Sequence, residues 1–315
     1  MTNFSTTLVQ FLSEDSLQLP GLLFSPPKKT KTAAIFLHGC GSSSVFYSVA
    51  RAHALAEGFA QNEIALLMFN NRGAHLIKKL NRVDDAGKEL EEVYLGTAYE
   101  QIKDCVLDIN GAIAYLQAQG YQQLYLIGHS TGANKIFVFD HHQPGNVLAG
   151  YLLLGGGDDT GMIYQQLGDW ATLQKCLAQA QEKIDQGQGE RFVPKAFFNG
   201  LLSYQSFYDV ANPDGEYNCF PFYELQERVE LSSKPLFNYF KQLSKPALVI
   251  YGEHDEHAPA KSGKKAVEIL QQQTQTANNQ LIDFAVIQEA DHGFHEKERE
   301  LGEAMAGWIK QRATS

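Results

Sequence analysis

Six short apolar runs recur along the chain from about residue 32 onward, separated by longer amphipathic segments. The predicted strands cover residues 32–39, 64–70, 123–129, 148–156, 246–252 and 282–288. Most of these runs are apolar throughout and do not alternate, which is typical of strands covered on both faces. Apolar strands that alternate with helical segments indicate βαβ units, so the sequence predicts an α/β fold with a mainly parallel sheet.

Further elements extend this predicted sheet. Two earlier runs, LVQFLS and LQLPGLLFS, predict an antiparallel strand pair at one edge. A helix is predicted from the capping box TAYE, Thr97 to Glu100, and its apolar residues keep helical spacing until Gly120. Other helices are predicted directly after Ser130, at about residues 261–273 and at about residues 295–312.

Residues 158–244 interrupt this alternation. Two stretches, 162–184 and 192–211, have helical periodicity, and no parallel strand is predicted before residue 246. We therefore expect an insertion at 158–244 into a core formed by residues 1–157 and 245–315. Its aromatic side chains fit two interpretations, lining of an apolar pocket or packing within the insertion itself. They are Phe197, Phe198, Tyr204, Phe207, Tyr208, Phe220, Phe222 and Tyr223.

The pentapeptide GHSTG, residues 128–132, lies between a predicted strand and a predicted helix. A G-x-S-x-G sequence in that context indicates a tight turn that exposes the serine hydroxyl at a helix N-terminus. The peptide dipoles there favour developing negative charge. Gly128 and Gly132 allow the strand and the helix to approach each other, and Ser130 is the candidate nucleophile.

A serine hydroxyl reacts as a nucleophile when a histidine removes its proton and an acid orients that histidine. His292, in EADHGF, follows the last predicted strand, and Asp255, in EHDEHAP, follows the strand before it. The chain order Ser130, Asp255, His292 differs from the orders of the chymotrypsin and subtilisin types. The alternative base is His295, and the alternative acids are Glu253, Glu256, Asp158 and Asp159.

The loop HGCGSSS follows the first predicted parallel strand. Sites for acyl transfer stabilise an oxyanion with backbone N–H groups, one after the nucleophile and one from this loop. Thr131 and Cys40 are therefore the predicted donors of an oxyanion hole, and Gly39 and Gly41 allow the loop to turn inward.

The motifs LHGCG, FNNRG, GHSTG, GEHD and ADHGF occur in this order at the ends of successive predicted strands. In this arrangement the chain resembles the serine-dependent members of the α/β-hydrolase superfamily over about residues 30–157 and 245–312. The resemblance implies a twisted, mostly parallel eight-stranded sheet with helices on both faces, a mobile lid at 158–244, no cofactor, and acyl transfer to water. FNNRGAH, GHSTGANK and LLLGGGDDTG also resemble a branch similar to siderophore ester hydrolases.

We therefore predict a serine hydrolase that cleaves a carboxylic ester of a small or medium acyl substrate through an acyl-enzyme. Ser130 attacks the carbonyl, His292 takes and returns the proton, and Asp255 orients the imidazole. The same residues can also cleave thioesters, amides or the carbon–carbon bond of a diketone, and the sequence does not distinguish these substrates. A ligand-binding or sensor protein with a hydrolase pocket and little turnover is the alternative from another class.

Composition argues against several other classes. The formal net charge of −10, from 26 basic and 36 acidic residues, argues against a nucleic-acid partner, because phosphate binding depends on clustered Lys and Arg. No apolar run reaches about 18 residues and the first residues do not resemble an export signal, so we expect a cytoplasmic protein without a membrane span.

Neither metal binding nor redox chemistry is predicted for the cysteines or for the EHDEHA segment. The cysteines Cys40, Cys105, Cys176 and Cys219 are scattered, which favours free thiols. The histidines and carboxylates of EHDEHA do not match a metal-binding motif, so no metal site is predicted. The sequence gives no indication of the oligomeric state.

Overall fold

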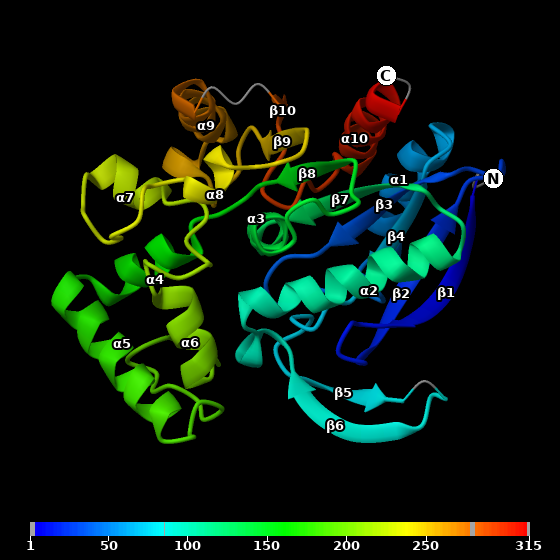
Figure 1. Ribbon diagram of the computed structural model, residues 1–315. Helices are drawn as coiled ribbons and strands as arrows, with labels where there is room; N and C mark the ends of the chain where they lie inside the picture. The colour runs from blue at the N-terminus through cyan, green and yellow to red at the C-terminus, as the bar shows by residue number, and fades with distance from the viewer. Residues whose placement is uncertain (1–3, 85, 278–280, 314–315) are drawn as a thin grey trace.

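The computed structural model describes residues 4–84, 86–277 and 281–313 (Figure 1). Its centre is an eight-stranded sheet with the strand order β1-β2-β4-β3-β7-β8-β9-β10. These strands are β1 (Ser5–Leu12), β2 (Gln18–Ser25), β3 (Thr32–Leu37), β4 (Ala65–Phe69), β7 (Gln123–His129), β8 (Gly150–Leu154), β9 (Ala247–Gly252) and β10 (Ile282–Ile287). From β4 to β10 in that order all pairings are parallel, whereas β2 is antiparallel to both β1 and β4. The predicted α/β fold with an antiparallel edge pair is confirmed.

Helices cover both faces of the sheet. One face packs against α1 (Val49–Gln61) and α10 (Glu298–Ala313), and the other against α2 (Cys105–Ala118), α3 (Thr131–His142) and α9 (Gly263–Ala277). In β7, Leu124 and Leu126 pack in the layer of α2 and α3, while Tyr125 and Ile127 pack in the layer of α1 and α10. Since both faces of this strand are buried, its sequence is apolar throughout.

Helices α1 and α10 touch through their backbones. A Cβ atom added at Gly58 of α1 would lie 2.7 Å from the carbonyl carbon of Gly302 in α10, so no other residue fits at position 58 without displacing a helix. On the outer side of the same contact, Arg299 forms an ion pair with Glu57 at 3.0 Å. The two helices therefore form one rigid layer on this face of the sheet.

Between β8 and β9 the chain leaves the sheet and forms a group of helices, at the left of Figure 1. They are α4 (Asp159–Leu167), α5 (Trp170–Asp185), α6 (Tyr204–Ala211), α7 (Phe222–Glu227) and α8 (Asn238–Lys241). The helical prediction for 162–184 holds apart from a break at Gly168, which adopts a left-handed conformation. The prediction for 192–211 is wrong before Tyr204, because Phe192 and Ser203 pair as an isolated bridge there.

Most of the aromatic side chains named above divide between two cores. One group packs with α4, α5 and α6 in a separate cluster, which includes Phe197, Tyr204 and Phe207. Phe220 and Phe222 pack instead into the main core beside α3, where the ring of Phe220 meets Phe137. These contacts support the packing interpretation of the aromatic residues.

The capping box predicted at Thr97 is wrong. Two short 3₁₀ turns, Thr97–Tyr99 and Ile102–Asp104, precede α2, which begins at Cys105. The Thr97 hydroxyl accepts a hydrogen bond from the Gly41 amide at 2.7 Å and donates one to the Gly73 carbonyl at 3.0 Å. Contacts with residues distant in the chain therefore occupy the group that a capping box would use.

A separate two-stranded hairpin, β5 (Lys78–Val83) and β6 (Glu89–Leu95), lies outside the sequence predictions. Its strands are rich in charged side chains and lack a continuous apolar face. Arg82 connects the hairpin to the core through an ion pair with Asp15 at 2.9 Å. Within the described ranges, no helix is long and apolar enough to cross a membrane.

Candidate active site

Ser130 lies at a sharp turn between β7 and α3. Its backbone has φ 56° and ψ −129°, a conformation that is strained for a residue with a side chain. A Cβ atom at Gly128 would lie 2.1 Å from the Gly132 carbonyl oxygen, and one at Gly132 would lie 2.5 Å from the Leu37 carbonyl oxygen. Only glycine fits at both positions, and together they hold the Ser130 side chain at the N-terminus of α3.

His292 and Asp255 meet from neighbouring loops, which follow β10 and β9. The two atoms in contact are Nδ1 of His292 and Oδ1 of Asp255, at 2.9 Å. Asp255 is fully buried, and the His257 amide donates a second hydrogen bond to the same oxygen at 2.9 Å. Because a carboxylate accepts hydrogen bonds, this contact places the imidazole proton on Nδ1 and leaves Nε2 as the basic nitrogen.

The backbone of His292 is also held on both sides. Its amide donates to the Glu256 carboxylate at 3.0 Å, and its carbonyl accepts a hydrogen bond from Nε2 of His129 at 2.8 Å. Burial lowers the pKa of His129 well below its usual value, so this ring is a neutral donor. The position of the His292 ring is therefore fixed by its backbone contacts as well as by Asp255.

A cavity of about 390 Å³ opens at the carboxyl ends of the strands. Ser130, His292, Cys40 and Thr131 all line it, and Asp255 lies behind His292, away from the cavity wall. The structure thus brings four of the five predicted site residues, Ser130, His292, Cys40 and Thr131, to one cavity. The apolar part of the lining consists of Phe36, Tyr47, Ala52, Met68 and Met162.

The amides of Cys40 and Thr131 are available to a ligand in this cavity. In the described part of the chain, neither N–H donates to another backbone group or side chain. The Cys40 loop is held beside them, because the next amide, that of Gly41, is bonded to the Thr97 hydroxyl.

The alternative acids and the alternative base have other partners. Asp158 caps α4 by accepting the Gly161 amide at 2.7 Å, and Asp159 accepts the Thr131 hydroxyl at 3.3 Å. Burial raises the pKa of Asp158 to about 7 and that of Asp159 to about 6. The remaining pairings are Glu253 with Lys264, Glu256 with the His292 amide, and the exposed His295 with Asp291.

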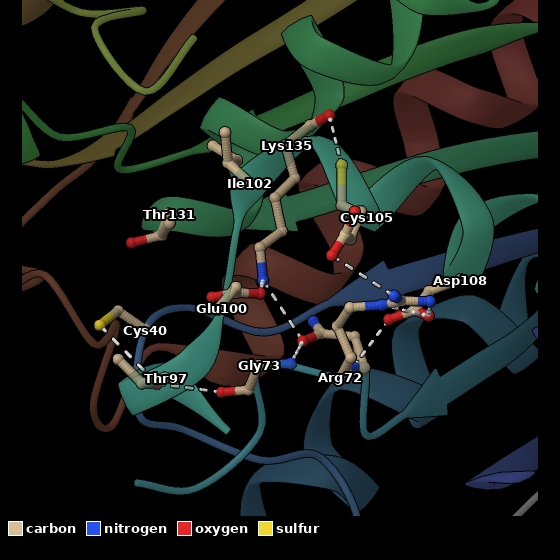
Figure 2. Close-up of polar contacts among 12 residues, drawn as sticks. Cys40, Arg72, Gly73, Thr97, Glu100, Ile102, Cys105, Asp108, Thr131 and Lys135 are labelled. Atoms are coloured by element: carbon tan, nitrogen blue, oxygen red, sulfur yellow. Dashed lines mark hydrogen bonds and ion pairs between the residues drawn. The ribbon is translucent and has the colours of Figure 1, made fainter. Parts of the chain in front are cut away.

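A buried polar network lies beside the Cys40 loop (Figure 2). Lys135 of α3 forms an ion pair with Glu100, and both side chains are almost completely excluded from solvent. Arg72 binds Asp108 through its backbone amide, at 2.7 Å, and through its guanidinium, at 2.8 Å. Figure 2 shows Thr97 in contact with both Cys40 and the Gly73 carbonyl, so Thr97 connects the Cys40 loop to this region.

Sequence reasoning missed two residues of this region, Thr97 as a support for the Cys40 loop and Arg51 in the cavity wall. The one available signal for the network in the sequence is Lys135, a charged residue directly before the apolar run 136–139 of α3. Among the described residues, no three His, Cys, Asp or Glu side chains converge as a metal site would require.

Comparisons with known proteins agree with this architecture. A family model described as "Protein of unknown function (DUF1749)" matches residues 88–310, and no curated protein matches the sequence. Est1E from Butyrivibrio proteoclasticus is 13% identical with a TM-score of 0.58, covering 98% of this chain and 99% of that chain. It has also been solved with ferulic acid bound.

Two further solved structures have the same fold. An esterase from Pyrococcus furiosus is 15% identical with a TM-score of 0.56, over 98% of this chain and 91% of that chain. A highly thermostable carboxyl esterase from Bacillus coagulans, in complex with glycerol, is 12% identical with a TM-score of 0.60, over 98% of both chains. Identities this low establish a shared fold, which is the α/β-hydrolase fold.

Proposed function

We propose that this chain, which belongs to the DUF1749 family, is a serine esterase that hydrolyses a carboxylic ester of a small or medium acyl substrate. One observation carries the proposal. Ser130, in its strained turn, and His292, in contact with Asp255, line the same cavity. A protein that only binds a ligand has no need for a hydroxyl, an imidazole and a buried carboxylate in this arrangement.

In the proposed reaction, the Ser130 hydroxyl attacks the ester carbonyl while Nε2 of His292 takes its proton. The imidazolium that forms is stabilised by Asp255 and returns the proton to the departing alcohol. The acyl group then sits on Ser130, and water activated by the same imidazole releases it as the acid. The 2.9 Å contact between Nδ1 and Oδ1 supports these roles, because it leaves Nε2 as the base.

Negative charge on the carbonyl oxygen requires donors during both steps. We assign this role to the backbone N–H groups of Cys40 and Thr131, which line the cavity. The N-terminus of α3 adds its dipole at the same place, because Thr131 is the first residue of that helix.

Residues 158–244 are proposed to act as a lid over this cavity. The segment contributes Asp158, Asp159 and Met162 to the lining, so its position determines which substrates reach Ser130. Esters are preferred over thioesters, amides and diketones because the similar solved structures are described as esterases. The finer resemblance to siderophore ester hydrolases stays a prediction.

A fluorophosphonate probe tests the proposal directly. The probe is expected to label the wild-type protein at neutral pH and to leave Ser130→Ala unlabelled. Hydrolysis of p-nitrophenyl esters from acetate to octanoate is expected to stop in the same variant. Ser5→Ala, at an exposed position of β1, is the matched control and keeps both properties. Activity that survives in Ser130→Ala would place the reaction at another nucleophile.

A further inference from the structure

Arg51 is a cation without an ion pair in the wall of the proposed active site. It lines the cavity together with Ser130 and His292. In the part of the chain that the structure describes, its guanidinium has no hydrogen bond and no carboxylate within 4.0 Å. Arg72, which is buried, is bound by Asp108 and Asp15, whereas Arg51 is half-buried and has no such partner.

The charged groups nearest to Arg51 act on it only from a distance. Burial lowers the pKa of Arg51, and the more distant negative charges of Glu298 and Asp291 do not offset this effect. Asp291 is already engaged by His295, at 2.7 Å. The guanidinium is therefore partly desolvated and lacks a close counter-charge, and a bound anion would supply one.

Two further features of the lining lie close to Arg51 in the chain. Ser44 is one of the lining residues and is 5% exposed, and its buried hydroxyl has no hydrogen-bond partner among the described residues. The N-terminus of α1, a helix of 13 residues, contributes Tyr47, Ser48 and Arg51 to the wall and has no acidic residue in its first turn. An unpaired arginine, an unsatisfied hydroxyl and a helix N-terminus are each groups that bind oxyanions in proteins.

The cavity that Arg51 and Ser130 share also has apolar walls. Phe36, Ala52 and Met68 line it and are themselves buried. A substrate that contacts both Ser130 and Arg51 would therefore carry an ester carbonyl, an apolar spacer and a negatively charged group.

We propose that Arg51, with Ser44 and the N-terminus of α1, binds an anionic oxygen group of the substrate, a carboxylate or a phosphate, so that the preferred esters carry a second, negatively charged end. This inference rests on the proposed esterase activity and names its substrate class. Arg51 is then a specificity-determining residue, because it contacts the substrate at a distance from the reacting carbonyl.

The test compares p-nitrophenyl hemiglutarate with its neutral amide analogue, p-nitrophenyl glutaramate. We expect kcat/KM to favour the hemiglutarate by about 10- to 100-fold, as a charge-assisted hydrogen bond predicts. In Arg51→Gln this ratio is expected to fall close to one, and Arg51→Lys is expected to lie between. A p-nitrophenyl ester of 4-phosphonobutyrate, measured in parallel, decides whether the carboxylate or the phosphate-like group is preferred.

Arg299→Gln is the matched control, since it removes the same charge from an exposed side chain of α10. This variant is expected to keep the wild-type ratio. A wild-type ratio near one, or a ratio that Arg51→Gln leaves unchanged, would overturn the proposal. A purely structural role for Arg51 would lower kcat/KM for both esters equally.

Binding measured without turnover separates this inference from the esterase proposal. Calorimetry with Ser130→Ala is expected to show tighter binding of monobutyl glutarate than of butyl glutaramate, and Arg51→Gln in the same background is expected to abolish the difference. If no ester is hydrolysed but this difference is observed, the esterase proposal fails and the anion site stands. Equal binding of the two ligands contradicts the anion site itself.

Discussion

The imidazole of His292 contacts the carboxylate of Asp255 at 2.9 Å, although the two residues are 37 positions apart in the chain. Asp255 is fully buried, and its second oxygen, Oδ2, has no hydrogen-bond partner among the described residues. A buried carboxylate in this position is stabilised when the ring beside it becomes positively charged. The contact therefore orients the His292 ring for its role in the proposed reaction.

Replacing Asp255 should mainly slow the chemical step. For Asp255→Asn we expect kcat on a p-nitrophenyl ester to fall by about 10⁴-fold, because the amide favours the wrong tautomer of His292. Asp159→Asn should lose much less, since Asp159 contacts the Thr131 hydroxyl and not the imidazole. Urea denaturation of both variants checks that they are folded. A larger loss in Asp159→Asn would identify that residue as the acid.

Thr97 should affect turnover through the position of the Cys40 amide. Thr97→Val removes the acceptor of the Gly41 amide and the donor to the Gly73 carbonyl. We expect kcat to fall by about 10-fold with little change in KM, less than the about 10²- to 10³-fold loss when an oxyanion donor is removed outright. Thr97→Ser keeps the hydroxyl and should restore kcat. Equal losses in both variants would indicate a packing effect.

The buried pair of Lys135 and Glu100 should contribute strongly to stability once one partner is changed. Glu100→Gln leaves the Lys135 charge buried and unpaired, and is expected to lower the free energy of unfolding by about 3–5 kcal/mol. Adding Lys135→Met should recover part of that loss. Urea denaturation at pH 7 measures both effects. Lys28→Met, which breaks an exposed pair with Glu63, is the control and should show little change.

Stability should also depend on pH through Asp159. Burial raises its pKa to about 6 in the folded protein, above the value of about 3.9 for an unfolded chain. The folded state therefore binds this proton more tightly, and stability is lost as the pH rises from about 4 through about 6. Asp159→Asn removes this loss. The difference in free energy of unfolding, variant minus wild type, should therefore be more positive at pH 7.5 than at pH 4.5. If denaturation curves give the same difference in free energy of unfolding between variant and wild type at both pH values, the prediction is refuted.

Local patterns in the sequence were sufficient to predict the strands of the main sheet and the loops that carry the candidate site residues. A strand buried on both faces, such as β7, is apolar throughout, and the G-x-S-x-G turn requires glycine at fixed positions on either side of Ser130. The positions of Asp255 and His292 follow from the same logic, because the carboxyl ends of parallel strands lie at one edge of the sheet.

Such local patterns could not predict contacts between segments that are distant in the chain. The Thr97 hydroxyl and the Gly41 amide are 56 residues apart, and a capping box explained Thr97 equally well from local spacing. The strands β5 and β6 carry mostly polar side chains and therefore show no apolar periodicity. Arg51 resembles any surface arginine in a helix until the cavity around it is known.

The backbone contact between Gly58 and Gly302 restricts how this protein can acquire new substrates. Helix α1 carries Arg51 at its start, and α10 begins shortly after His292, so a side chain at position 58 would shift both walls of the cavity together. Laboratory evolution toward bulkier esters should therefore accumulate its successful substitutions in residues 158–244. Position 58 should remain glycine in every active descendant.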